Sequence, residues 1–368
     1  EKKHSLGSAS SALPQVIAMH LPQFHPIPEN DQWWGRGFTE WTNVAKCTSR
    51  FPGHYQPHLP SDLGFYDLRL PESRAAQAEL ASAYGIGGFC YYHYWFNGRR
   101  ILQRPVREIL AFGEPDLPFC LCWANENWTR RWDGLDEQVL LKQDYSDKDD
   151  LDHIHHLIRS FEDPRYIRFD DKPVFLVYRT TNLPNPERTA NLWRDAVNKA
   201  GFKGLHLGMV QGFRSERINP TSVGFDFGME FAPDWYELQP HVDPRSPATF
   251  WQRICGLRQP QFQDIAVKYD NLRNNMLAKP LPDYPFYRCV TPGWDNSARR
   301  VTGATILVDS TPDSYEFWLK AVVKEAISGN REFVFINAWN EWAEGNHLEP
   351  CQRWGRKYLE ATKRAIAQ

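Results

Sequence analysis

Eight short apolar runs, separated by helical patterns, constrain the fold of this chain more than any other feature of its sequence. The runs span residues 16–19, 88–92, 119–123, 174–178, 205–210, 225–230, 286–290 and 333–337. Helical patterns cover residues 71–84, 106–112, 149–161, 186–200, 313–328 and 355–367. Strands that alternate with helices are typical of a parallel sheet, because each helix returns the chain to the start of the next strand.

Eight repeats of this unit favour a closed (β/α)8 TIM barrel over an open, doubly wound sheet. No GxGxxG motif follows the first run, which argues against a dinucleotide-binding fold. No repeat or linker divides the chain, so we expect one catalytic domain over residues 16–368. Residues 1–15 lack an apolar core and are expected to be a disordered leader or an expression remnant.

The composition argues against several classes of partner. With 43 Lys+Arg against 45 Asp+Glu, the chain has no basic excess for nucleic acid or a membrane surface. Its longest apolar stretches are strand-sized, so no membrane insertion is expected. The seven cysteines are an odd number, and four of them (Cys90, Cys120, Cys122 and Cys289) fall in apolar runs. This pattern predicts reduced core thiols in a cytoplasmic protein.

Aromatic residues are abundant, with 15 Trp, 15 Tyr and 22 Phe. Many must fill the core, but tryptophans recur beside Asn, Glu, His and Arg. Flat apolar sugar faces stack on such rings while neighbouring amides and carboxylates bond the hydroxyl groups. The sequence therefore favours an oligosaccharide or polysaccharide as the ligand, and it leaves the oligomeric state open.

Polar and aromatic side chains follow most of the predicted strands. Because the carboxyl ends of barrel strands share one face, these residues should form a bowl there. Two long loops, residues 21–70 and 232–246, should rise on the same face. The expected substrate-binding residues are His20, Trp41, His93, Tyr94, Trp123, Asn125, Glu126, Trp128, Glu230, Trp294, Asp295, Trp339 and Asn340.

Two carboxylates three residues apart, Glu341 and Glu344, follow the eighth strand and face the same side if the chain turns there. They are the expected catalytic residues, because glycoside cleavage needs one carboxyl to protonate the leaving oxygen and a second group to act at the sugar carbon. A plain helix N-terminus would also favour two acidic residues. The flanking Trp339, Asn340 and Trp342 are more than such a cap requires.

Six stretches of the sequence resemble WbsX-type proteins of bacterial polysaccharide gene clusters, which are related to glycoside hydrolase family 99. They are HLPQFHP (20–26), WWG (33–35), GFTEWTNV (37–44), GFCYYHYW (88–95), WANENW (123–128) and NAWNEWAEG (337–345). The resemblance to family 99 is carried mainly by the NEWAEG element and the predicted barrel.

That resemblance implies a retaining endo-acting glycosidase for a mannose- or rhamnose-like sugar of a bacterial glycan, such as an O-antigen. Glu341 would be the base that assists the substrate's own 2-hydroxyl, through a 1,2-anhydro sugar, and Glu344 the general acid. No metal or other cofactor is expected. WbsX-type proteins are also called glycosyltransferases, and Asp147 and Asp149 offer a loose DxD pattern for that alternative. A non-catalytic glycan-binding barrel is the third interpretation, and Glu126 could be a further catalytic carboxylate.

Overall fold

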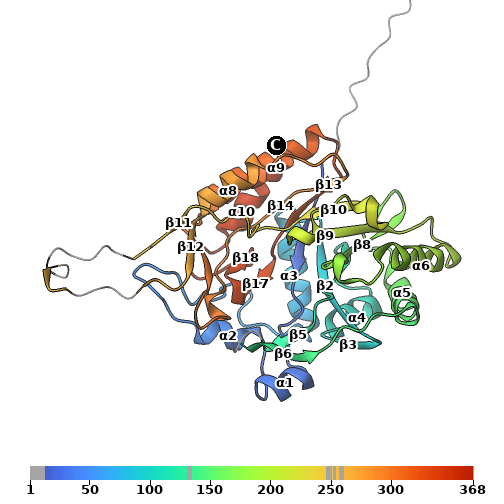
Figure 1. Cartoon of the computed structure of the whole chain (residues 1–368), viewed down its shortest axis with the longest axis horizontal. Helices are drawn as coiled ribbons and strands as arrows, with labels where there is room; N and C mark the ends of the chain where they lie inside the picture. The colour runs from blue at the N-terminus through green and yellow to red at the C-terminus, as the bar shows by residue number, and fades with distance from the viewer. Residues whose placement is uncertain (1–12, 131–134, 246–250, 252–253, 257–260, 368) are drawn as a thin grey trace, which may run out of the picture.

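The structure, a computed structural model, describes residues 13–130, 135–245, 251, 254–256 and 261–367. Its centre is a parallel barrel in which every predicted run supplies a strand (Figure 1). The strands are β1 (Gln15–His20), β2 (Gly88–Phe96), β4 (Phe119–Trp123), β8 (Lys172–Val177), β9 (His206–Gln211), β10 (Phe227–Glu230), β13 (Phe286–Tyr287), β14 (Cys289–Val290) and β16 (Phe333–Ile336).

The barrel is completed by one broken strand. β13 pairs with β10, and β14 pairs with β16. Only Arg288 separates these two pieces, so together they fill the place of the seventh predicted strand. The (β/α)8 prediction is confirmed, and the carboxyl ends of all eight strand positions meet at one mouth.

Large side chains fill the barrel interior, and some of them fit only because the neighbouring strand carries a glycine opposite them. At Gly208 of β9, an added Cβ would lie 2.3 Å from the ring of Phe227 on the neighbouring strand. The glycine therefore makes room for a fully buried aromatic ring between β9 and β10. This close approach explains why the strand carries a residue with low strand propensity at its centre.

The six predicted helices are all present within two residues of their expected bounds. They are α3 (Pro71–Ala83), α4 (Arg104–Phe112), α5 (Asp147–Phe161), α6 (Pro186–Lys199), α9 (Pro312–Ser328) and α10 (Lys357–Ile366). The side chains of Ser146, Asn185 and Thr311 cap α5, α6 and α9. A further helix, α8 (Tyr269–Ala278), was not predicted, and it lies beside α9 and α10 along the upper side of Figure 1.

Extra elements are added at both ends of the barrel. The 21–70 loop carries α1 (Pro28–Trp34) and α2 (Glu40–Lys46), and short hairpins are formed by β3 (Arg99–Ile101) with β2, β7 (Arg168–Phe169) with β8, and β5 (Trp128–Arg130) with β6 (Leu135–Leu141). A separate sheet of β11 (His241–Val242), β12 (Ile265–Lys268) and β15 (Thr305–Val308) lies on the left of Figure 1. Among the described residues, no helix has the length and apolar character to cross a membrane.

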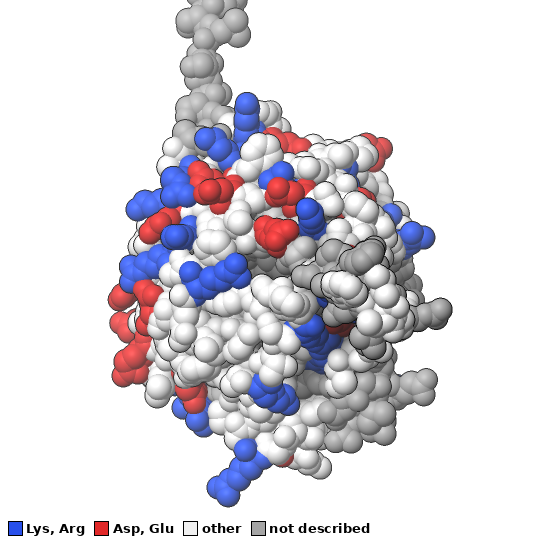
Figure 2. All heavy atoms as spheres, turned by 90° about the vertical axis from the view of Figure 1, so that its left-hand side faces the viewer, with Lys and Arg blue, Asp and Glu red and all other residues white. Residues whose placement is uncertain are grey.

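The proposed leader falls mostly on residues 1–12, which lie outside the described residues. Its expected end at residue 15 is wrong, because Gln15 already belongs to β1 and pairs with Phe333 of β16. The face turned towards the viewer in Figure 2 carries Lys and Arg interspersed with Asp and Glu near its upper edge, and its middle is largely uncharged. Its described part therefore presents charges of both signs instead of one continuous basic field.

Candidate active site

The two predicted catalytic carboxylates lie on a tight hairpin beyond β16. β17 (Asn340–Glu341) pairs with β18 (Asn346–His347), and a 3-10 turn at Trp342–Glu344 joins them. Gly345 ends the turn at φ 56°, where an added Cβ would lie 2.8 Å from Cβ of Asp295. The pair therefore belongs to a hairpin instead of the helix N-terminus considered as the alternative, and glycine is required to close it.

A buried carboxylate anchors this hairpin from below. Glu349 accepts hydrogen bonds from Nε1 of Trp342 at 2.6 Å, Nε2 of Gln77 at 2.7 Å and the hydroxyl of Tyr66 at 2.9 Å. Its burial raises its pKa to about 7 despite these donors. Because Trp342 lies between the two candidate catalytic residues, Glu349 fixes the turn that presents them.

One guanidinium group holds three carboxylates together at the mouth. Arg299 contacts Glu344 at 2.6 Å through Nη1, and Glu341 at 3.2 Å and Glu40 at 3.1 Å through Nη2. Glu40 is fully buried and belongs to α2 of the long 21–70 loop. Asp295 places this arginine, because its side chain caps the short turn Asn296–Ala298 that precedes Arg299. The arginine thus joins three separate loops around the carboxylate pair.

The environment of Glu341 favours its protonated form. Burial, followed by the charge of Glu344, raises the pKa of Glu341 to about 8, and Arg299 only partly opposes this shift. Burial also raises the pKa of Glu40. The raised pKa of Glu341 favours its protonated form near neutral pH, while Glu344 accepts a hydrogen bond from Nη1 of Arg299. Unequal pKa values of this kind divide the acid and base roles of two carboxyls.

This shift predicts a pH-dependent stability. Since the folded-state pKa of Glu341 is raised from 4.5 to about 8, the folded protein binds more protons than the unfolded chain between these values. The unfolding free energy contributed by Glu341 therefore falls as the pH rises through this window. Glu341→Gln should be about 4 kcal/mol more stable than the wild type at pH 8, and nearly equally stable at pH 4.5. Urea denaturation at both pH values measures this difference, and an equal gain at both would contradict the assigned shift.

A cleft of about 610 Å³ opens beside the carboxylate pair. Its walls are largely aromatic, and Trp235 and Trp294 meet edge to face with ring centroids 5.1 Å apart. The main lining residues are Trp34, Tyr92, Tyr94, Glu126, Trp128, Tyr178, Phe213, Phe231, Trp235, Trp294, Arg299, Arg300, Asn337, Glu341 and Glu344. Aromatic faces beside a few carboxylates and arginines suit a polyhydroxylated ligand with apolar ring faces.

Six of the predicted site residues line this cleft: Tyr94, Glu126, Trp128, Trp294, Glu341 and Glu344. Glu126 lies at the same mouth as the catalytic pair, and its carboxylate pairs with Arg179 at 2.8 Å. Arg179 also contacts the fully buried Glu216 at 3.3 Å. Glu126 is therefore held at the cleft by a charged network of its own.

Three predicted residues point away from the cleft because neighbouring side chains of a strand alternate between its two faces. His20 bonds Gln77 of α3 at 3.1 Å, and His93 contacts His153 of α5 at 2.9 Å. Trp123 is fully buried and its ring lies 4.6 Å from that of His153. The expectation that these three bind substrate is corrected to a packing role outside the barrel.

Four further predicted residues are engaged in structural contacts. Asn125 bonds the backbone of Arg179 at 2.8 and 2.9 Å, and Asn340 bonds that of Leu21 at 2.7 and 3.0 Å. Glu230 forms ion pairs with Lys279 and Arg288, and Asp295 contacts His54 at 2.7 Å. They fix the loops and the broken strand, and they do not line the cleft.

The remaining two predicted residues support the hairpin. Trp41 donates to the carbonyl of Tyr66 at 2.9 Å and packs 5.4 Å from Trp342. Trp339 is fully buried, with its ring 5.0 Å from that of Phe89. Both are turned inwards, so the prediction that they contact substrate is also corrected.

Several residues of the cleft were missed by sequence reasoning. Tyr92 was present in a quoted motif, and its position two residues before Tyr94 puts it on the same strand face. Tyr178 ends the fourth predicted run and Trp235 lies in the predicted 232–246 loop, so both could have been found. Arg299 carries no local signal, because it reaches the carboxylates from a loop more than 40 residues away in sequence.

The described residues contain no group of three or more His, Cys, Asp or Glu side chains arranged to hold a metal ion. The three carboxylates that converge at the mouth are instead bridged by Arg299. The cationic partner of the candidate catalytic pair is thus a side chain of the chain itself.

Comparisons with known proteins agree with the resemblance seen in the sequence. Residues 16–362 match the family described as Glycosyltransferase WbsX. The WxcX protein of Xanthomonas campestris pv. campestris strain B100 is 45% identical over 367 residues, which are 98% of this chain and 51% of that protein. The WxcX protein of strain ATCC 33913 is 46% identical over 356 residues, 96% of this chain and 50% of that protein. The chain spans about half the length of these relatives.

Two solved structures have a similar fold. The family 99 endo-α-mannosidase of Bacteroides thetaiotaomicron, in complex with BIS-TRIS-propane, is 15% identical with a TM-score of 0.60 and 96% of both chains covered. A glycoside hydrolase-like protein is also 15% identical, with a TM-score of 0.59, covering 98% of this chain and 97% of the other. At this identity the likeness establishes the barrel fold and not the reaction.

Proposed function

The chain belongs to the WbsX family, and on this premise we propose that it is a glycan-acting enzyme, a retaining endo-acting glycoside hydrolase. The substrate is a bacterial polysaccharide or glycan with a mannose- or rhamnose-like sugar. The observation that carries the proposal is the pair Glu341 and Glu344, held by Arg299 on a rigid hairpin at an aromatic cleft. Two carboxyls with unequal environments are what glycoside cleavage requires.

In the proposed reaction, Glu341 takes the proton of the substrate 2-hydroxyl while that oxygen attacks the anomeric carbon. Glu344 gives its proton to the leaving oxygen as the glycosidic bond breaks. Water then opens the 1,2-anhydro sugar, Glu344 takes the water proton, and Glu341 returns its proton to the 2-oxygen. The pair holds one proton at the start and at the end, so the cycle is balanced.

The electrostatics of the pair favour the opposite assignment of acid and base to the one that the resemblance implies. The resemblance to family 99 assigns the acid to Glu344, whereas the raised pKa of Glu341 favours a proton on Glu341. Arg299 contacts both carboxyls and stabilises whichever is ionised. If the resemblance assigns the roles correctly, the proton must move from Glu341 to Glu344 when substrate binds. A substrate with an activated leaving group can test which residue is the acid.

A glycosyltransferase is the second candidate, and the description of the matched family favours it. The DxD-like residues give it little support, because Asp147 pairs with Arg188 and Asp149 accepts from Nε1 of Trp95 at 2.9 Å. Both carboxylates lie in the first turn of α5, where acidic residues stabilise the helix. Thermal-shift titration with nucleotide sugars, with and without manganese, separates the candidates. Stabilisation by a nucleotide sugar would favour the transferase.

The aromatic wall predicts a loss of affinity when it is truncated. Trp235 is half-buried, lines the cleft and packs against Trp294 without touching the carboxylate pair. Trp235→Ala should raise KM about 5–10-fold with kcat nearly unchanged, because a stacked ring contributes about 1 kcal/mol to holding a sugar face. Steady-state kinetics on a released-oligosaccharide assay measure both constants. Loss of kcat at an unchanged KM would contradict a binding role.

A further inference from the structure

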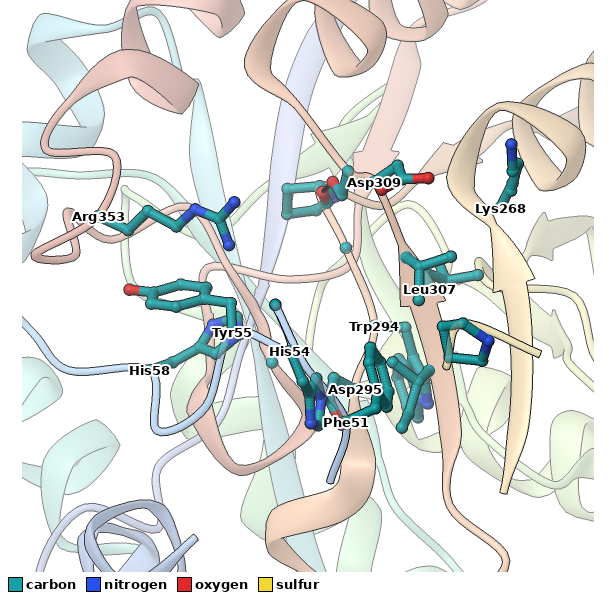
Figure 3. Close-up of a pocket in the computed structure, with 18 of the residues that line it drawn as sticks. Phe51, His54, Tyr55, His58, Lys268, Trp294, Asp295, Leu307, Asp309 and Arg353 are labelled. Carbon is teal, nitrogen blue, oxygen red and sulfur yellow. Dashed lines mark hydrogen bonds and ion pairs between the residues drawn. The ribbon is translucent and has the colours of Figure 1, made fainter. Parts of the chain in front are cut away.

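A second cavity of about 370 Å³ lies next to the cleft, between the barrel and the β11–β12–β15 sheet (Figure 3). The 51–58 segment and the 353–358 segment form one side of it, and Lys268, Leu307 and Asp309 the other. Rings of Tyr55, Trp294, Trp354 and Tyr358 contribute to its walls. It is enclosed by residues of three separate loops and one sheet, and it has no part in the proposed cleavage.

The two cavities share a thin wall. Trp294 lines both of them. Next to it, the amide of Asp295 donates to the carbonyl of Glu344 at 2.6 Å, and Gly345 packs against Asp295. The carboxylate of Asp295 is occupied, since it accepts from Gln56 at 2.7 Å and contacts His54 at 2.7 Å. A ligand in the second cavity would therefore lie one residue layer from the catalytic turn.

A chain of hydrogen bonds leaves one ring nitrogen of this cavity, Nε2 of His58, as an acceptor. Nδ1 of His347 lies 2.9 Å from the carbonyl of Glu349, so it must carry the proton. Its Nε2 is then an acceptor, and it receives the proton of Nδ1 of His58 at 2.9 Å. Burial lowers the pKa of His58 to about 4, which keeps this imidazole neutral. Nε2 of His58 is left unprotonated, with the ring lining the cavity.

The other polar groups of the cavity balance one another. The guanidinium of Arg353 lies over the rings of Tyr55 at 4.8 Å and Trp354 at 5.2 Å, and Figure 3 shows it directed into the cavity. Lys268 adds a second positive charge, and Asp309 and Asp243 add two negative charges. An anion would meet these carboxylates, so the charge does not favour it. Donors, acceptors and aromatic faces together suit a neutral ligand that carries several hydroxyl groups.

We propose that this cavity is a second carbohydrate-binding site, which takes one neutral hexopyranose unit between its aromatic walls and Arg353, with a hydroxyl group donating to Nε2 of His58. The inference rests on the proposed function in one respect, namely that the neighbouring cleft takes a glycan. A chain that crosses Trp294 would occupy both sites, which makes long glycans better substrates than short ones.

Binding of simple glycosides to the inactive Glu344→Gln protein tests the site. The probes are methyl α-D-mannopyranoside, methyl α-L-rhamnopyranoside and methyl β-D-glucopyranoside, with inorganic phosphate as the anionic probe, in calorimetry and ligand-detected NMR. Arg353→Ala removes a donor from an exposed position, and His58→Phe keeps a ring but removes both the acceptor Nε2 and the donor Nδ1 that bonds His347. Arg107→Ala, an exposed arginine of α4 that does not line the cavity, is the matched control.

At least one glycoside should bind, and both cavity variants should weaken its binding at least 10-fold, whereas Arg107→Ala leaves it unchanged. In the otherwise wild-type chain, Arg353→Ala should raise KM for a polysaccharide and leave cleavage of a short glycoside within 2-fold. The inference is overturned if no glycoside binds, if binding resists both variants, or if phosphate alone binds. A different result would refute the proposed function alone: the wild type releases no product from any glycan, yet a glycoside still binds and Arg353→Ala weakens that binding.

Discussion

Replacing Glu344 with Gln should lower kcat on a natural glycan by at least about 1000-fold, because the variant cannot protonate the leaving oxygen. The substitution keeps the volume of the side chain, and the amide oxygen can still accept from Nη1 of Arg299. The fold should therefore survive, as judged by circular dichroism and thermal unfolding. Glu79→Gln, at an exposed position of α3, is the control and should retain full activity. Unreduced turnover by Glu344→Gln would sink the assignment.

An activated substrate separates the acid from the base. A glycosyl fluoride leaves without a proton, so the variant that lacks the acid should regain activity on it, whereas the variant that lacks the base should not. With the roles implied by the resemblance, Glu344→Gln is rescued and Glu341→Gln is not. The reverse result would assign the proton donor to Glu341, in agreement with its raised pKa.

Arg299→Met should lower the unfolding free energy at pH 7 by about 3 kcal/mol. The substitution removes the ion-pair partner of the buried Glu40 and leaves Glu341 and Glu344 close together without their shared cation. Breaking a buried ion pair costs about 3–5 kcal/mol, and we expect the low end because the side chain of Arg299 is 15% exposed. Urea denaturation measures the loss.

The cost of Arg299→Met should shrink at pH 4, because burial raises the pKa values of Glu341 and Glu40 and both carboxyls are then protonated and no longer need a cation. Arg300→Met is the matched control, since this neighbouring arginine also lines the cleft. It should change the unfolding free energy by less than about 1 kcal/mol. Equal effects of the two substitutions would show that Arg299 does not hold the carboxylates together.

The barrel could be predicted because its strands and helices differ in the spacing of their apolar residues, and that spacing is local. Counting eight units then fixed the closed sheet. The β11–β12–β15 sheet escaped prediction because β11 has only two residues and its partners lie far apart in the sequence. The helix α8 escaped because Asp270, Asn271, Asn274 and Asn275 obscure the apolar face formed by Tyr269, Leu272 and Met276.

The candidate site was predicted in outline, and its errors have one main cause. Every polar or aromatic residue near a strand end was expected in the bowl, although alternation turns about half of them outwards. Thus Tyr94 faces the cleft while its neighbours His93 and Trp95 face α5. The electrostatic centre, Arg299, could not be predicted, since only the folded chain brings its loop to Glu40 and the catalytic hairpin.

Cleavage of a glycan in water labelled with oxygen-18 tests the central claim most directly. A panel of bacterial O-antigens and mannans is incubated with the wild type and with Glu344→Gln, and the released oligosaccharides are analysed by mass spectrometry. The wild type should release oligosaccharides with one oxygen-18 atom at the new reducing end, and Glu344→Gln should release none. Products that appear only when a nucleotide sugar is added, or that Glu344→Gln forms equally well, would contradict hydrolysis by this carboxylate pair.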